Sequence, residues 1–272
     1  MAMESWISES PGYSDPHQVG ALGIFSNNYN YFFPSFFFPS SMTLSGYDAH
    51  ILGHGKGREE PIVIEESKML DKDQFVLPAH YAEDIKSILL TRGMIEDRIE
   101  KVAFDISRYY PSTESLHIIC LLKGGRMFFQ NLTDTLNRIY RFKDGQEQPP
   151  FVEYFVNLKK DKLHPGHIHT LSDDLSGLSG KNVLVVEDLV DTGKTLSKFC
   201  RSILELEPKS LRVASLFEKR TSKDGVTFKA DFAGFSIPDL FVVGNCMDLN
   251  ERFRDLEHLA ILTDEAYSKY KN

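Results

Sequence analysis

Residues 182–195 read Asn-Val-Leu-Val-Val-Glu-Asp-Leu-Val-Asp-Thr-Gly-Lys-Thr. The unbroken apolar run Val183–Val186 is typical of a strand that is buried on both faces, as in a parallel sheet. A Thr-Gly-Lys-Thr turn then opens a helical pattern that we expect to extend from about 192 to 206. Glu187 and Asp188 thus stand at the carboxyl end of a buried strand, where α/β sheets bind their ligands.

Apolar and amphipathic segments alternate on both sides of this stretch. The apolar residues of one segment, from Ile95 to Ile106, recur at spacings of three and four, as a helix with one buried face requires. The alternation predicts an α/β fold with a mostly parallel sheet flanked by helices on both faces. We expect further strands at 62–64, 116–122, 152–158, 211–217, 241–243 and 259–262, and helices at about 94–110 and 127–142.

Composition limits the class of partner. The chain has 272 residues, 42% of them hydrophobic, which suits one α/β domain with an extra segment. Its formal net charge of -8 argues against a nucleic-acid partner, because such binding neutralises phosphates with Lys and Arg. An anionic small substrate remains compatible, since a helix N-terminus or a bound cation can supply local positive potential.

Segments that would place the protein in a membrane or a secretory route are missing from the pattern. The sequence has no apolar run of membrane-spanning length and no basic start followed by an apolar core. We therefore predict no integral membrane segment and a cytoplasmic protein. Cys120, Cys200 and Cys246 are far apart and lie in or near apolar segments, which predicts buried free thiols in a reducing compartment.

The first 52 residues differ from the rest. Residues 28–41 are aromatic but are interrupted by Pro34 and Pro39, which excludes a long helix. We expect residues 1–52 to form a poorly ordered, aromatic-rich extension and residues 53–272 to form the globular domain. Contact of the phenylalanines between 32 and 38 with a membrane surface is an alternative for this extension.

The turn after the central strand favours a phosphorylated sugar as ligand. Backbone N–H groups of residues 191–195 can converge on a phosphate, and the dipole of the following helix assists them. Glu187 and Asp188 would accept hydrogen bonds from ribose hydroxyls or hold Mg²⁺. A nucleoside-triphosphate P-loop is disfavoured because it needs Gly at position 188, where the chain has Asp. The remaining alternative is a capped helix start with solvated acids.

Residues 185–195 resemble the phosphoribosyl-pyrophosphate signature of type I phosphoribosyltransferases, in particular the hypoxanthine-guanine(-xanthine) branch with its protozoan members. The resemblance covers about Gly53 to Lys271 and implies the type I fold with a small hood region. It also implies phosphoribosyl pyrophosphate and a purine base as substrates, Mg²⁺ as cofactor, and a homodimer or homotetramer. The phosphoribosyl-binding residues that it implies are Glu187, Asp188, Thr192, Gly193, Lys194 and Thr195.

Further motifs carry the same resemblance. Leu122, Lys123 and Gly124 match the loop that binds pyrophosphate, in which the peptide between the Leu and Lys positions can be cis. Arg254 matches the family's pyrophosphate arginine, and bidentate contact suits its guanidinium. Asp191 matches the residue that acts as general base or acceptor at purine N7.

The purine-binding residues implied by the resemblance are Lys219, Phe241, Val242 and Asp248. Lys219 would donate to the 6-oxo group, and an ammonium can only donate, which disfavours the 6-amino group of adenine. Phe241 would stack on the base, and backbone at Val242 and Asp248 would read its 2-position. The metal ligands implied are Glu187, Asp188 and, for a second magnesium, Asp248.

The sequence departs from the family in the loop that closes over the active site. The usual Ser-Tyr pair is missing from residues 156–167, and Asn157 stands where Arg is usual. A catalytically impaired homologue that binds phosphoribosyl pyrophosphate or nucleotide is therefore an alternative, as is a phosphoribosyltransferase for adenine, orotate or uracil. His164, His167 and His169 suggest zinc, but a loop containing Pro and Gly is a poor rigid metal site.

Overall fold

The computed structural model describes residues 58–144, 151–160, 168–221 and 228–271. The chain divides into two compact units, Met1–Ser40 and Ser41–Asn272, and every described residue belongs to the second. The predicted extension 1–52 lies outside the described residues, as do His164 and His167, and only the backbone of His169 is described.

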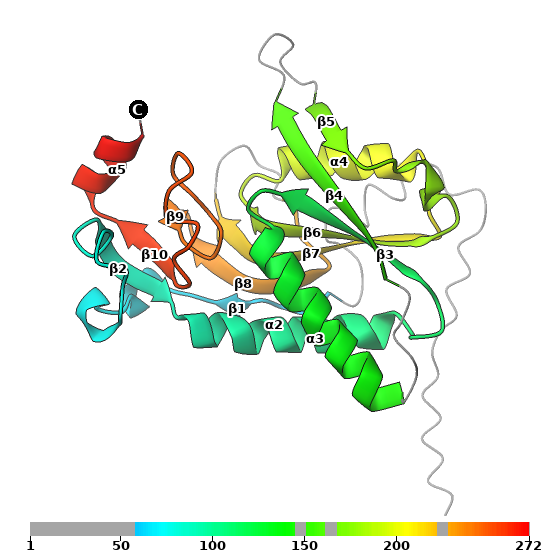
Figure 1. Cartoon of the computed structure of the whole chain (residues 1–272), viewed down its shortest axis with the longest axis horizontal. Coiled ribbons are helices and arrows are strands. Elements are labelled where there is room, and N and C mark those ends of the chain that lie inside the picture. Colours follow the sequence, from blue (N-terminus) through cyan, green and yellow to red (C-terminus); the bar gives the residue numbers. More distant parts are fainter. Residues whose placement is uncertain (1–57, 145–150, 161–167, 222–227, 272) are drawn as a thin grey trace, which may run out of the picture. The chain divides into compact units, whose positions relative to one another are not determined.

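Within the described residues, the main element is a seven-stranded sheet in the order β1-β8-β7-β6-β3-β4-β5 (Figure 1). Neighbouring strands pair in parallel except for β4 and β5, which are antiparallel. This confirms the mostly parallel sheet. The strands are β1 (Ile62–Val63), β3 (Leu116–Leu122), β4 (Phe151–Lys160), β5 (Ile168–Ser172), β6 (Asn182–Val190), β7 (Ser210–Arg220) and β8 (Phe232–Pro238).

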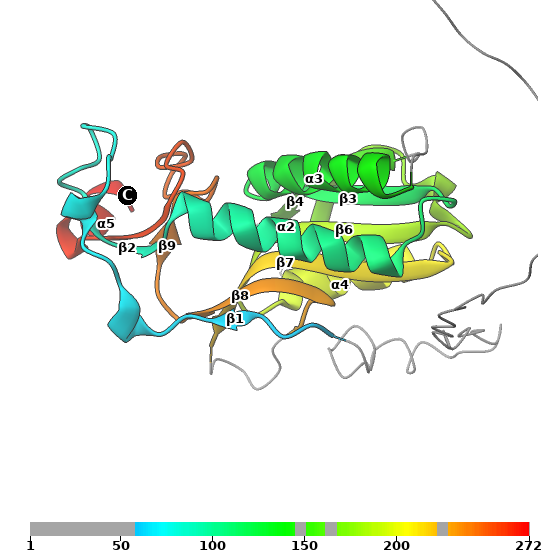
Figure 2. The same cartoon turned by 90° about the horizontal axis from the view of Figure 1, so that it is seen from below.

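Helices cover both faces of this sheet, as the apolar runs predict (Figure 2). Helices α2 (Arg92–Tyr109) and α3 (Arg126–Asp144) share a core with Ile118 and Cys120 of β3. Helix α4 (Lys194–Leu204) shares a second core with Ile119 and Leu121 of the same strand. Alternate residues of β3 thus face different helices, so both faces of the strand are buried.

The hood is a smaller sheet with its own core. Strands β2 (Ile85–Leu90), β10 (Leu259–Leu262) and β9 (Val242–Val243) pair antiparallel in that order. Helix α5 (Asp264–Tyr270) follows β10 and begins where the Thr263 side chain accepts a hydrogen bond from the Ala266 amide at 3.1 Å. Short 3-10 helices lie at Glu66–Lys68, Lys72–Gln74 and Ser176–Leu178.

Several boundaries differ from those predicted. Strand β6 continues through Glu187 to Val190, because Leu189 and Val190 pair with Phe217 and Glu218 of β7. Strand β7 likewise continues to Arg220, so Lys219 belongs to a strand and not to the turn after it. Helix α4 begins at Lys194 rather than 192. Strands β2, β5 and β8 and helix α5 were not predicted.

The structure also describes the burial of the cysteines and the length and polarity of the helices. Cys120, Cys200 and Cys246 are free and buried, as their apolar surroundings predict. In the described part of the chain, every helix is too short or too polar to cross a membrane.

Candidate active site

Three of the predicted motifs stand at the same edge of the large sheet. Strands β3, β6 and β7 are neighbours and run parallel, so their carboxyl ends meet there. Leu122 ends β3, Glu187 and Asp188 lie in the last part of β6, and Lys219 is the penultimate residue of β7. The fold therefore brings together residues that are almost one hundred positions apart, at the edge where such sheets bind ligands.

The turn from β6 into α4 requires its glycine. Asp191 follows the strand and is exposed, and Gly193 is the N-cap of α4 with a φ of 69°. A Cβ on Gly193 would lie 2.1 Å from Cβ of Phe228, so a side chain here would be strained and would also clash. Because the N-cap residue has no side chain, it cannot cap the first-turn amides, and the start of α4 can receive an anion.

The adjacent carboxylates are held in a half-buried position. Asp188 Oδ1 accepts a hydrogen bond from the Leu189 amide at 2.8 Å. Burial, reinforced by the neighbouring Asp188 carboxylate, raises the pKa of Glu187 well above its usual range. A cation beside them would relieve this penalty. Mg²⁺ often takes only one or two protein carboxylates and completes its shell with substrate oxygens and water, so this carboxylate pair fits that ion.

The predicted pyrophosphate loop lies directly against these acids. The Leu122–Lys123 peptide is cis, in agreement with the family resemblance. A Cβ on Gly124 would lie 1.8 Å from Asp188 Oδ2, so only glycine lets the loop approach this carboxylate. The predicted pyrophosphate loop after β3 and the predicted phosphoribosyl motif of β6 are therefore in direct contact.

A cluster of charged side chains connects this loop with the hood. Lys123 Nζ lies 3.1 Å from Glu251 Oε1, and Arg254 Nε lies 3.2 Å from Glu251 Oε2. Arg254 also pairs with Asp248, its Nη2 lying 2.7 Å from Oδ1. The two cations predicted to bind pyrophosphate are therefore neighbours that share Glu251 as counter-ion, and both of these hydrogen bonds lower the pKa of Glu251.

The hood segment that holds this cluster has an unusual backbone. Among its residues, positive φ angles occur at Asn245, Cys246, Asn250, Glu251 and Phe253, none of which is glycine. Such residues persist only where surrounding contacts hold them. One such contact is Arg254 Nη1, which donates to the Cys246 carbonyl at 2.7 Å.

The residues predicted to bind the purine are placed on both sheets. Lys219 is half-buried at the end of β7, Val242 is buried in β9, and Phe241 is 41% exposed just before β9. The Phe241 ring contacts Tyr267 edge-on, with centroids 4.9 Å apart. Among the described residues, no hydrogen bond or ion pair joins Lys219 or Phe241 to the charged cluster.

The stretch that corresponds to the family's closing loop is described only in part. Asn157 lies in β4, where its backbone pairs with Leu122 of β3 and Leu171 of β5. Residues 161–167 lie outside the described residues. The effect of the missing Ser-Tyr pair on loop closure stays a prediction.

The fold is that of a phosphoribosyltransferase: a parallel sheet carries the predicted sugar-phosphate motif and the adjacent loop at one edge. Comparison with known proteins identifies the branch of this family. The family model "Phosphoribosyl transferase domain" matches residues 87–250. The chain belongs to the phosphoribosyltransferase family, in its hypoxanthine-guanine(-xanthine) branch with the type I fold.

Individual relatives support this assignment. The hypoxanthine-guanine-xanthine phosphoribosyltransferase of Plasmodium falciparum is 45% identical over 80% of this chain and 95% of its own length. The hypoxanthine-guanine phosphoribosyltransferase of Homo sapiens is 40% identical over 77% of this chain and 96% of its own. A crystal structure of the Schistosoma mansoni hypoxanthine-guanine phosphoribosyltransferase with IMP gives a TM-score of 0.65 at 35% identity, covering 78% of this chain and 100% of that one.

Sequence reasoning missed Glu251. Its position three residues before Arg254 is compatible with an ion pair within a turn, but its contact with Lys123 spans 128 positions and requires the tertiary structure. The resemblance named the two cations and did not indicate what they contact before substrate arrives.

Proposed function

We propose that this protein transfers the 5-phosphoribosyl group from phosphoribosyl pyrophosphate to N9 of a 6-oxopurine, giving a nucleoside monophosphate and pyrophosphate in purine salvage. The observation that carries the proposal is the convergence of three motifs at the carboxyl ends of β3, β6 and β7. Membership of the hypoxanthine-guanine(-xanthine) branch supports hypoxanthine and guanine as bases, with xanthine as a further candidate.

Each part of the site has a task in this reaction. The start of α4, with Thr192, Lys194 and Thr195, would hold the 5-phosphate. Glu187 and Asp188 would hold the ribose hydroxyls and Mg²⁺, with Asp248 as a candidate ligand for a second ion. Mg²⁺ would neutralise charge on the leaving pyrophosphate.

Other residues would stabilise the leaving group and accept the proton or hydrogen bond from the base. Breaking the bond from ribose C1 to pyrophosphate leaves positive charge on the sugar and negative charge on the leaving group. Lys123, Arg254 and the backbone at Leu122–Gly124 would stabilise the departing pyrophosphate. Asp191, exposed beside the sugar motif, would accept the proton or hydrogen bond at purine N7 while N9 attacks C1. Lys219 would donate to O6.

A panel of bases tests the proposal. The purified chain would receive phosphoribosyl pyrophosphate, Mg²⁺ and one of hypoxanthine, guanine, xanthine, adenine, orotate or uracil, with nucleotide formation followed spectroscopically. We expect turnover with hypoxanthine and guanine. Turnover only with adenine, orotate or uracil would contradict the base assignment. Donor binding without any turnover would establish the impaired-homologue alternative, which no described contact favours.

Replacing Lys219 tests whether its ammonium group donates a hydrogen bond to the 6-oxo group of the base. Lys219→Met should raise the KM for hypoxanthine and guanine by about 10- to 100-fold, because a hydrogen bond from a charged donor is lost. The KM for phosphoribosyl pyrophosphate should change little. Lys209→Met, which removes an exposed lysine paired with Glu114 near the other end of β7, is the matched control. An unchanged KM for both bases would remove Lys219 from the base site.

Replacing Glu251 tests the role of the charged cluster. Glu251→Gln should lower the KM for pyrophosphate in the reverse reaction by about two- to fivefold, because Lys123 and Arg254 lose a competing anion. High salt should reduce the effect. Glu257→Gln, which alters a similarly exposed ion pair with Arg92, is the control. A raised KM for pyrophosphate would show that Glu251 instead orients the cations.

The proposed location rests on the sequence pattern, and the proposed assembly rests on the family resemblance. We propose a cytoplasmic enzyme that forms a homodimer or homotetramer. Sedimentation velocity on the purified chain checks the assembly state, and a monomer at assay concentration would refute it.

A further inference from the structure

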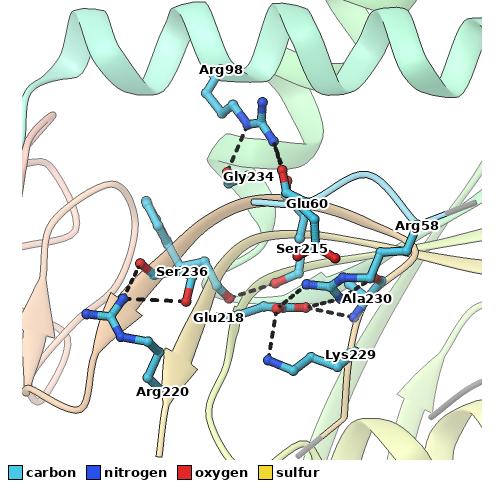
Figure 3. Close-up of polar contacts among 12 residues, drawn as sticks. Arg58, Glu60, Arg98, Ser215, Glu218, Arg220, Lys229, Ala230, Gly234 and Ser236 are labelled. Atoms are coloured by element: carbon cyan, nitrogen blue, oxygen red, sulfur yellow. Dashed lines mark hydrogen bonds and ion pairs between the residues drawn. The ribbon is translucent and has the colours of Figure 1, made fainter. Parts of the chain in front are cut away.

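A buried charged network surrounds Glu218, the residue before Lys219 in β7 (Figure 3). Glu218 is 1% exposed. Its carboxylate accepts two hydrogen bonds from Arg58, at 3.0 Å and 2.7 Å, and one from the Ala230 amide at 2.8 Å. Lys229 Nζ adds an ion pair at 3.6 Å.

Such a network is a weak source of stability. Burying charges removes them from water, and an apolar pair of similar size often serves stability equally well. What an ion pair adds is directional geometry, because a guanidinium and a carboxylate meet along two parallel hydrogen bonds. We therefore ask which chain segments the hydrogen bonds of Glu218 hold in place.

The network joins three segments that are distant in sequence. Arg58 precedes β1, Glu218 lies near the end of β7, and Ala230 precedes β8. Arg58 Nη1 also donates to the Ala230 carbonyl at 2.6 Å, so both backbone groups of Ala230 are held. These hydrogen bonds fix the end of β7 to the segment 228–230.

Each of these fixed segments reaches the active site. Phe228, two residues before Ala230, packs against Gly193 so closely that a Cβ there would lie 2.1 Å from Cβ of Phe228. Lys219 directly follows Glu218 on the strand. Arg220, on its other side, donates to the carbonyls of Ser236 and Ile64, both at 2.7 Å. Lys219 is thus held between two anchored neighbours.

We propose that Glu218 is a positioning residue, which acts through Arg58 and Ala230 to hold the base-reading Lys219 and the phosphate-binding turn at Gly193 in one productive geometry. This inference rests on the proposed function, because it assigns Glu218 to the sites for both substrates. Glu218 touches neither substrate, and its effect should appear as weakened binding of both.

The test compares Glu218→Gln with the double variant Arg58→Met/Glu218→Leu. Steady-state kinetics would give kcat and both KM values, and thermal unfolding would give Tm. Asp105→Asn is the control, because it alters another buried carboxylate, paired with Lys101 on α2 and outside the site.

We expect Glu218→Gln to lower Tm and to raise the KM for the base and for phosphoribosyl pyrophosphate, each by about tenfold. The double variant should recover part of the loss in Tm, because the Arg58 and Glu218 charges are removed together, although the buried backbone groups of Ala230 lose their partners. Both KM values should stay raised. Asp105→Asn should lower Tm with unchanged KM values.

A purely structural role for Glu218 gives a different result. Partial unfolding would reduce the amount of active enzyme, and hence the apparent kcat, with both KM values within twofold of wild type. That result in the double variant would overturn the inference even if Glu218→Gln does not fold. A wild-type chain without turnover would instead overturn the proposed function, and this inference with it.

Discussion

Asp191→Asn is expected to lower kcat by about 10²- to 10⁴-fold, while both KM values stay within about threefold of wild type. The substitution keeps the size of the side chain and removes the charge that would accept the proton, or the hydrogen bond, at purine N7. Binding should survive because, in the proposed site, other groups would hold the phosphate and the ribose.

The design needs a control for the loss of one surface carboxylate. Asp97→Asn, on the exposed face of α2, makes the same chemical change away from the site. It should leave kcat unaltered. An unchanged kcat in Asp191→Asn would show that this carboxylate is not the acceptor in the chemical step.

Gly124→Ala should weaken the binding of phosphoribosyl pyrophosphate by about 10²-fold or more. The added methyl carbon would lie 1.8 Å from Asp188 Oδ2, so either the loop or the carboxylate must move. Hydrogen bonds to a charged group contribute about 1.5–3 kcal/mol each, so losing one or two of them to the pyrophosphate corresponds to roughly this factor. Titration calorimetry with Mg²⁺ would measure the affinity directly.

Gly177→Ala provides the matched control, because no heavy atom beyond the glycine and its chain neighbours lies within 4 Å of its added Cβ. It should bind the donor as the wild type does. Equal affinity for Gly124→Ala and wild type would contradict the close contact between the pyrophosphate loop and the ribose motif.

The sequence predicts a strand correctly where its local apolar pattern matches the burial that the fold gives it. The continuous apolar runs at Leu116–Leu122 and Leu259–Leu262 form strands with the predicted bounds. Strand β8 was missed because Gly234 and Pro238 weaken its pattern. Glycine at 234 is nevertheless required, since a Cβ there would lie 2.5 Å from the Leu216 carbonyl.

Strand ends were harder to predict than strand centres. Acidic residues are depleted in strands, so the sequence pattern predicts that this strand ends before Glu187. In the structure the backbone of β6 continues to pair with β7 as far as Val190. This continuation places the two carboxylates on a strand beside the loop at Leu122–Gly124.

In the candidate site, contiguous motifs could be found from the sequence, whereas contacts between distant residues could not. The residues from Glu187 to Thr195 could be proposed from the sequence because they are contiguous and form a recognisable motif, and their binding role stays a prediction. The partners of Lys123 and Glu218 could not, because Glu251 and Arg58 are 128 and 160 positions away. Glu218 in particular reads as a solvated charge within Glu-Lys-Arg, whereas the fold buries it.

Calorimetric titration of the wild-type chain with phosphoribosyl pyrophosphate, and separately with GMP, tests the central claim most directly. With Mg²⁺ present, we expect each ligand to bind with about one molecule per chain, and we expect donor binding to weaken when Mg²⁺ is chelated. Absence of heat with both ligands, from a folded chain and with Mg²⁺ present, would contradict the assignment of this strand edge as a phosphoribosyl site.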